Sequence, residues 1–149
     1  GAVKKGAVCA AVILAALLAG AVLAAPFVND LTAKQTAEGL RALPLPEDTR
    51  LVETAYAAGK LTGNGNGMQY FGAVLLQSGL SLAELEAHYA DCAQHDWECC
   101  VEPQADSAIR AVEHGSLRFD TSVSGEGYYI VYSWGSGLPF FQEFDLRGH

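Results

Sequence analysis

Basic residues are scarce in this chain of 149 residues, which has nine Lys and Arg against seventeen Asp and Glu. Lys4 and Lys5 precede a long apolar run, and every acidic residue lies from Asp30 onward. The segment after the run therefore has seven basic and seventeen acidic residues, a formal charge of −10. Such a surface repels nucleic-acid phosphates and anionic lipid headgroups. We therefore expect no nucleic-acid partner and no flat contact between this segment and an anionic bilayer.

Charged residues are absent from Ala7 to Ala25, and this stretch has no strongly polar residue either. As a helix, at a rise of ~1.5 Å per residue, it spans about 28 Å, close to the hydrocarbon thickness of a bilayer. A water-soluble helix of this length has a polar face, which this one lacks. Residues 1–26 are therefore predicted to form an N-terminal signal anchor or transmembrane helix, and residues 27–149 an extracytoplasmic α+β domain.

The two lysines before the apolar run predict its orientation. By the positive-inside rule, Lys4 and Lys5 keep the N-terminus in the cytoplasm and send the rest of the chain across the membrane. Either the helix stays as a single-pass anchor in the cell membrane, or the protein is secreted after cleavage behind Ala24, with Val22 two positions earlier as the other small residue of the site. The length of the run favours retention, and both outcomes place the domain outside the cytoplasm.

Catalytic motifs are also missing. The stretch Trp134–Gly137 lacks the glycine that a nucleophile elbow has two residues before its serine, and there is no His-Glu-x-x-His. Asp145 and His149 have the chemistry to assist a serine, but no motif positions them. A carboxylate pair would have to come from Glu53, Glu84, Glu86 and Glu98. We therefore expect a non-catalytic protein without a cofactor, with a small envelope hydrolase as an alternative.

The first part of the domain is predicted to run helix, strand, strand, helix. Asn29 and Asp30 are typical N-cap residues, and apolar residues follow at helical spacing as far as Leu43. Strands are predicted over 49–58 and 69–77, and the second is apolar on both faces, as in a central buried strand. The residues Ser81-Leu82-Ala83-Glu84 form a capping box that begins the second helix.

The second part of the domain is predicted to add strands over 97–102, 116–123 and 127–134. A short helix is predicted over 104–113, and residues 124–127 have the composition of a hairpin turn. The apolar tail after the last strand is predicted to pack back as an edge strand or irregular segment. Short hairpins dominate, so the predicted fold class is α+β: an N-terminal hydrophobic helix, then a small, mostly antiparallel sheet with helices on one face.

Glycine and asparagine alternate in the loop between the first two predicted strands. The candidate ligand-binding residues are Lys60, Gly63, Asn64, Gly65, Asn66 and Gly67. Successive backbone N–H groups in such a loop bind anions. The competing interpretation is a hairpin, because Gly and Asn tolerate positive φ. A P-loop does not fit, because Gly-Lys-Ser/Thr is missing, and no helix follows as a dinucleotide fingerprint requires.

Histidine and cysteine are concentrated in one short region, at His88, Cys92, His95, Cys99 and Cys100. These residue types bind zinc, but their spacing matches no standard zinc signature, and we assign no metal. Outside the cytoplasm, a disulfide from Cys92 to either Cys99 or Cys100 suits the oxidising compartment. Three interpretations stay open: buried free thiols, one disulfide, or a metal site.

Aromatic residues gather toward the C-terminus, at Tyr128, Tyr129, Tyr132, Trp134, Phe140 and Phe141. An exposed set of this kind would form a platform for a carbohydrate or a peptide. On a strand, aromatic side chains more commonly form core and cross-strand pairs, which is the interpretation we favour.

Two stretches resemble a group of small membrane-anchored envelope proteins of Clostridia-type Gram-positive bacteria. They are Gly-Lys-Leu-Thr-Gly-Asn-Gly-Asn-Gly-Met-Gln-Tyr, from Gly59 to Tyr70, and Asp-Leu-Arg-Gly-His at residues 145–149. The resemblance runs from about Leu45 to His149, and it implies an envelope location without implying an activity. We therefore expect a membrane-tethered binding or accessory module, partnered by an envelope protein or ligand.

The N-terminus carries a second resemblance, to type IV pilins and pseudopilins. Lys4-Lys5-Gly6 before an apolar helix is similar to the cleavage site of these families, and it implies the alternative of a structural subunit. The families have Glu as the fifth residue after the cleaved glycine, where this chain has Ala11.

Overall fold

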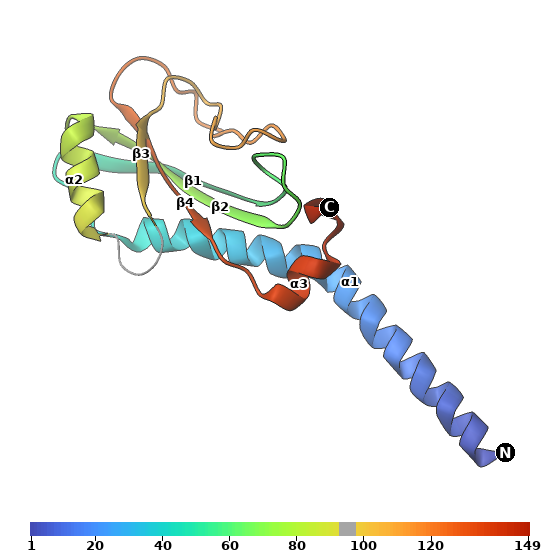
Figure 1. Ribbon diagram of the computed structural model, residues 1–149. Helices are drawn as coiled ribbons and strands as arrows, with labels where there is room; N and C mark the ends of the chain where they lie inside the picture. Colours follow the sequence, from blue (N-terminus) through green and yellow to red (C-terminus); the bar gives the residue numbers. More distant parts are fainter. Residues whose placement is uncertain (93–97) are drawn as a thin grey trace.

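The computed structural model describes residues 1–92 and 98–149. It has an α+β fold in which a long N-terminal helix leads into a four-stranded antiparallel sheet (Figure 1), which confirms the predicted fold class. The elements in chain order are α1 (Ala2–Ala42), β1 (Thr49–Gly59), β2 (Gln69–Ser78), α2 (Leu82–Cys92), β3 (Cys100–Pro103), β4 (Tyr128–Gly135), α3 (Pro139–Phe144) and the 3-10 helix η1 (Leu146–Gly148). The strand order is β1-β2-β4-β3, which makes β2 and β4 the central strands.

Hydrophobic side chains are packed on both faces of the sheet. On one face, Val74 and Leu76 of β2 pack with Leu40 of α1 and with α2. On the other face, Leu75 of β2 packs under the irregular segment 104–123. Figure 1 shows α1 and this orange segment on opposite sides of the sheet. The predicted central strand is confirmed, because consecutive residues of β2 are buried on both faces.

The capping box of α2 is confirmed atom by atom. The backbone N–H of Ser81 donates to Glu84 Oε2 at 2.8 Å, and the backbone N–H of Glu84 donates to Ser81 Oγ at 3.2 Å. The helix that follows places Leu85 and Tyr89 in the core, at the spacing of one helix face. A local signal is therefore sufficient to fix where this helix begins.

The prediction that a helix starts at Asn29 or Asp30 is wrong. α1 is continuous from Ala2 to Ala42 and contains Pro26, so both residues lie in its interior. Proline removes one helical hydrogen bond but is tolerated where other groups satisfy the freed backbone or the helix is supported by its neighbours. The boundary drawn between residues 26 and 27 thus falls inside a helix.

Small residues bring α1 close to the sheet. A Cβ atom added to Gly72 of β2 would lie 2.4 Å from the backbone N of Ala37. A Cβ added to Gly135 of β4 would lie 2.2 Å from the Thr36 hydroxyl oxygen. Both contacts are far shorter than van der Waals separation, so the two glycines are required by the packing of the helix itself. The buried face of α1 consists of Ala25, Asn29, Ala33, Ala37 and Leu40.

The helix predicted over 104–113 and the strand predicted over 116–123 are both wrong. The segment is irregular, with one isolated bridge between Ala108 and Arg118. Its apolar residues are nevertheless buried as the patterns implied: Ile109 is 2% exposed and Phe119 3%. The pattern of apolar and polar residues reflects which side chains are buried, whether or not the backbone pairs with a neighbouring strand. Residues 124–127 lead into β4 and do not join two strands.

The C-terminal tail forms two short helices, so the edge-strand alternative predicted for it is wrong. Pro139 begins α3, where its fixed φ and missing N–H cost nothing. Asp145 then starts η1, and its side chain accepts a hydrogen bond from the backbone N–H of Arg147. Figure 1 shows α3 and the C-terminus beside α1, where the helix leaves the domain.

Candidate functional site

The first half of α1 projects from the domain as an exposed apolar helix (Figure 1). Its most apolar window of 18 residues has a mean hydropathy of 2.7, and none of the window is buried. In its middle, Leu14 and Leu17 are 59% and 67% exposed. By length and composition α1 is able to cross a membrane, and a signal sequence near an N-terminus has the same properties.

A buried polar cluster joins α1 to the C-terminal tail at the level where the exposed half ends. We call Asn29, Tyr70, Asp145 and Arg147 the Asn29 cluster. The side-chain amide of Asn29 donates to Asp145 Oδ2 at 3.0 Å and to the Phe141 carbonyl at 3.1 Å. Its Oδ1 accepts from the Tyr70 hydroxyl at 2.8 Å. One buried side chain thus connects the helix, the central strand and the tail.

Arg147 completes this cluster from the solvent side. Its Nη2 donates to Asp145 Oδ2 at 2.7 Å and to the Pro26 carbonyl at 3.1 Å, and its Nη1 donates to Asp30 Oδ1 at 2.8 Å. Burial by itself raises the pKa of the Asp145 carboxyl, but hydrogen bonds from Arg147 and Asn29 outweigh it and lower the pKa to about 2. Asp145 is therefore ionised and fully hydrogen-bonded, which suits a structural joint.

Three of the carboxylates considered for catalysis, Glu53, Glu84 and Asp145, have structural partners. Glu53 accepts from the backbone N–H groups of Asp120 and Thr121, at 2.8 and 2.9 Å. Glu84 caps α2, and Asp145 belongs to the Asn29 cluster. The His149 ring contacts the carbonyl of Glu143 at 3.3 Å. These contacts hold the backbone in place, and Glu53, Glu84 and Asp145 lie on three different elements, β1, α2 and the start of η1.

The Gly63–Gly67 loop is attached to other segments at both ends. The Gly63 N–H donates to Glu113 Oε2 at 3.2 Å, and the Gly67 N–H donates to the Gly148 carbonyl at 2.6 Å. Both glycines have positive φ, of 74° and 122°, which explains the residue type by conformation alone. The backbone N–H of Lys60 is similarly used, by the Arg147 carbonyl at 3.1 Å.

These hydrogen bonds leave fewer backbone N–H groups of the loop available to bind an anion. Two of the loop's N–H groups are already occupied, and the Glu113 carboxylate at its entrance repels an anion. The three residues Asn64, Gly65 and Asn66 at the tip are exposed. Ligand binding by Lys60 and the Gly63–Gly67 loop stays a prediction.

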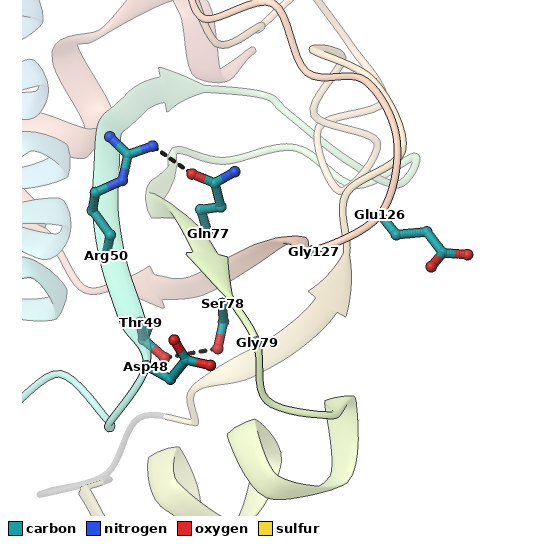
Figure 2. A pocket seen from close by; sticks show the side chains of 8 residues that line it. All are labelled: Asp48, Thr49, Arg50, Gln77, Ser78, Gly79, Glu126 and Gly127. Carbon is teal, nitrogen blue, oxygen red and sulfur yellow. Dashed lines mark hydrogen bonds between the residues drawn. The ribbon is translucent and has the colours of Figure 1, made fainter.

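A polar groove that the sequence analysis missed lies where β1 begins and β2 ends (Figure 2). Its volume is about 590 Å³. The Arg50 guanidinium donates to the side-chain oxygen of Gln77, and the hydroxyl oxygens of Thr49 and Ser78 lie 2.7 Å apart. The lining residues are Asp48, Thr49, Arg50, Gln77, Ser78, Gly79, Glu126 and Gly127. They come from three separate segments, so only the folded chain brings them together.

The cysteine and histidine region is described only in part. His95 and the side chain of Cys92 lie outside the described residues, so a disulfide from Cys92 to Cys99 or Cys100 stays a prediction. Burial raises the pKa of the Cys100 thiol, and the neighbouring Glu98 and Glu102 raise it further. Within the described part of the chain, no three His, Cys, Asp or Glu side chains form a group suited to a metal ion.

The aromatic set divides between β4 and α3, and on β4 Tyr128 and Tyr129 are partly buried against the hydrophobic core. Tyr132 and Trp134 of β4 pack against Phe71 of β2, with ring centroids 5.6 and 5.0 Å away, so the prediction of cross-strand packing is confirmed for them. Phe140 and Phe141 lie instead on α3, with ring centroids 5.2 Å apart. Phe140 is 55% exposed.

Asn29 is the key residue that sequence reasoning misplaced. It looks like an N-cap because asparagine is common there, and Pro26 seems to mark a break before it. The signal in the sequence was that small or polar residues recur at every fourth position, at Ala25, Asn29, Ala33 and Ala37. This recurrence is typical of one narrow face of a longer helix. No local pattern pointed to the groove.

Comparison with models of protein families, with curated proteins and with solved structures finds no match to this chain.

Proposed function

We propose that this protein is a single-pass, membrane-tethered module whose α+β domain stands outside the cytoplasm and binds an envelope protein or ligand. One observation carries the proposal: α1 contains both the exposed apolar half and the half that packs on the sheet, within one helix of 41 residues. An anchored α1 therefore fixes the height and the orientation of the sheet above the bilayer. A fixed geometry suits a module that presents a binding surface at a defined distance from the membrane.

The distribution of charge supports the orientation. Lys4 and Lys5 precede the apolar half and favour a cytoplasmic N-terminus. The acidic domain follows at the other end, where its charge keeps it soluble. The resemblance of the domain to small envelope proteins of Clostridia-type bacteria agrees with this location.

A binding role is favoured over a hydrolase by how three of the candidate carboxylates are used. Glu53, Glu84 and Asp145 each accept hydrogen bonds that hold the fold together. The groove near Arg50 and Glu126 offers charges of both signs to a polar ligand or a partner's surface. We propose it as the first place to look for the partner.

A pilin- or pseudopilin-like subunit is the second candidate, and the continuity of α1 favours it too. A stem that is apolar all round and rigidly joined to a sheet domain is able to bundle with the stems of other copies. Against this candidate stands Ala11, in the position where those families have Glu.

The experiment is membrane fractionation of the full chain, with mass spectrometry of its mature N-terminus and protease digestion from the outside. An intact N-terminus, retention after carbonate extraction and an accessible domain support the tethered module. Cleavage after Gly6 would favour the pilin-like subunit, and cleavage after Ala24 a secreted domain. A freely soluble cytosolic product would overturn the proposal.

A pair of variants separates anchoring from folding. Leu14→Arg combined with Leu17→Arg places two charges in the centre of the apolar half, each costing about 3 kcal/mol in the bilayer. We expect this protein to leave the membrane fraction. Leu45→Arg, at a similarly exposed leucine of the domain, is the matched control and should stay membrane-bound. Equal behaviour of both variants would contradict the anchor.

A further inference from the structure

Exposed apolar side chains lie on α1 and on the two elements bonded to it where it leaves the domain. We call this set the collar: Phe27, Leu138, Phe140 and Leu146. Phe27 is 77% exposed and Leu146 80%. The residues come from three elements far apart in the sequence, namely α1, the start of α3, and η1. The fold therefore assembles an apolar surface that no local stretch of sequence contains.

Two hydrogen bonds place these elements at the same level of α1. The Asn29 amide donates to the Phe141 carbonyl of α3 at 3.1 Å, and Arg147 of η1 donates to the Pro26 carbonyl at 3.1 Å. α3 and η1 thus flank a single turn of the helix. Figure 1 shows both beside α1 at the base of the domain.

The collar is a concentration of apolar residues and not a random sample of the surface. Singly scattered apolar side chains are normal on soluble proteins. Outside α1, the described residues include five large apolar side chains that are exposed: Leu45, Tyr56, Leu138, Phe140 and Leu146. Three of the five belong to the collar. Most of the large exposed apolar side chains of the domain therefore lie at the end from which the apolar half of α1 projects.

The length of the helix sets the depth of the collar. From Lys5 to Ala25, at ~1.5 Å per residue, α1 rises about 30 Å, which equals the hydrocarbon thickness of a typical bilayer. With Lys5 at the cytoplasmic interface, the next turn of α1 lies in the outer interface. Phe27 is on that turn, and α3 and η1 flank it. Interfaces are where aromatic side chains concentrate in membrane proteins.

We propose that the collar inserts into the outer interface of the bilayer, so that the domain sits directly on the lipid surface and does not stand clear of it. This inference rests on the proposed membrane anchor. The partner is the zwitterionic lipid interface, because the domain is acidic and an anionic surface repels it. Contact is confined to the collar, and nearby Asp30 and Asp145 are both paired with Arg147.

Quenching of tryptophan fluorescence by brominated lipid tests this in the full chain, reconstituted into phosphatidylcholine vesicles. Phe140→Trp and Leu146→Trp each add a probe at an exposed collar position on a different element. Leu14→Trp is the probe of the membrane span. Tyr56→Trp, at an exposed aromatic residue of β1, is the matched control. The unmodified protein gives the background of the native tryptophans, which is subtracted.

We expect bromines near the headgroup end of the acyl chains to quench the probes at 140 and 146 by at least about twofold, and bromines at the chain centre to quench the probe at 14. The probe at 56 should be unaffected. If the probe at 14 is quenched but the probes at 140 and 146 are not, the insertion of the collar is contradicted, whereas the membrane anchor is still supported. An unquenched probe at 14 would overturn both. Quenching at 56 equal to that at 140 would overturn docking through the collar, because the domain would then adsorb without a preferred face.

Discussion

The two halves of α1 belong to one helix but have opposite surroundings. Residues 7–24 have no charged side chain and are exposed over nearly their whole length, whereas residues 28–42 include charged and polar side chains on their exposed surface and bury one narrow face. In water, apolar residues are expected to be buried and polar ones exposed. Most of the second half obeys this rule, whereas the first half violates it unless its medium is lipid. The difference marks one position along a single helix, near Ala25, where exposed apolar side chains give way to packing on the sheet.

The change falls within one turn of the helix. Ala25 is the first fully buried residue of α1, and Asn29 is the next residue on the same face. The Asn29 cluster ties that turn to the tail, and the collar lies around it. Packing on the sheet thus begins where the exposed apolar half of α1 ends, which makes this junction the most informative place to perturb.

The largest expected effect is on the packed half. In Gly72→Val the new side chain meets backbone atoms of Thr36 and Ala37 at less than 3 Å, and neither is able to move aside without lifting the helix. We expect the free energy of unfolding to fall by at least about 3 kcal/mol. Urea unfolding of the detergent-solubilised protein, followed by tryptophan fluorescence, measures it. Gly65→Ala is the control, because a Cβ at Gly65 meets nothing within 4 Å. Equal stability of both variants would contradict the close approach of α1.

The next effect is at the junction. Asn29→Ala removes the amide and leaves the buried Tyr70 hydroxyl and Asp145 carboxylate with fewer partners. We expect a loss of about 2 to 3 kcal/mol in the same assay. Gln35→Ala, at an exposed amide of the same helix, should change stability by less than about 0.5 kcal/mol. If the two alanine variants were equally stable, the Asn29 cluster would not be what joins helix and tail.

Acid should weaken the same junction. An Asp carboxyl has an ordinary pKa of 3.8, and that of Asp145 is lowered to about 2 in the folded protein. The stabilisation is therefore complete above pH 4 and is lost as the pH falls through 2, amounting to about 2 kcal/mol. Urea unfolding at pH 5 and pH 2 measures the loss. Asp145→Asn should remove this part of the pH dependence. Parallel loss of stability in the variant and the unmodified protein would assign the acid sensitivity to other groups.

Local signals in the sequence predicted the elements that depend on them. The capping box at Ser81 and the doubly apolar β2 were confirmed, because hydrogen bonds between near neighbours and burial on both faces leave direct patterns in the sequence. The burial of Ile109 and Phe119 also followed from pattern. Their secondary structure could not be predicted in the same way. The irregular segment 104–123 covers one face of the sheet, and its apolar and polar residues alternate as they would in a strand.

Long-range contacts explain what the sequence could not reveal. Gly72 is needed because Ala37 lies against it, and nothing near Gly72 in the chain indicates that helix. The continuity of α1 was hidden by Pro26 and by two residues typical of an N-cap. The groove at Arg50 and the collar at Phe140 each combine segments that are separated by dozens of residues, so neither exists before the chain folds.

The smallest expected effect is on the exposed half, and it tests the comparison most directly. Ala16 lies in that half and is exposed, whereas Ala37 is 1% exposed against the sheet. Leucine has room at position 16, so Ala16→Leu should change the free energy of unfolding of the domain by less than about 0.5 kcal/mol. Ala37→Leu, the same change on the same helix, should cost about 1 to 3 kcal/mol because it overpacks the contact with Gly72. A matching loss at position 16 would mean that the exposed half packs against protein, such as a second copy of the stem, and that lipid is not its only neighbour.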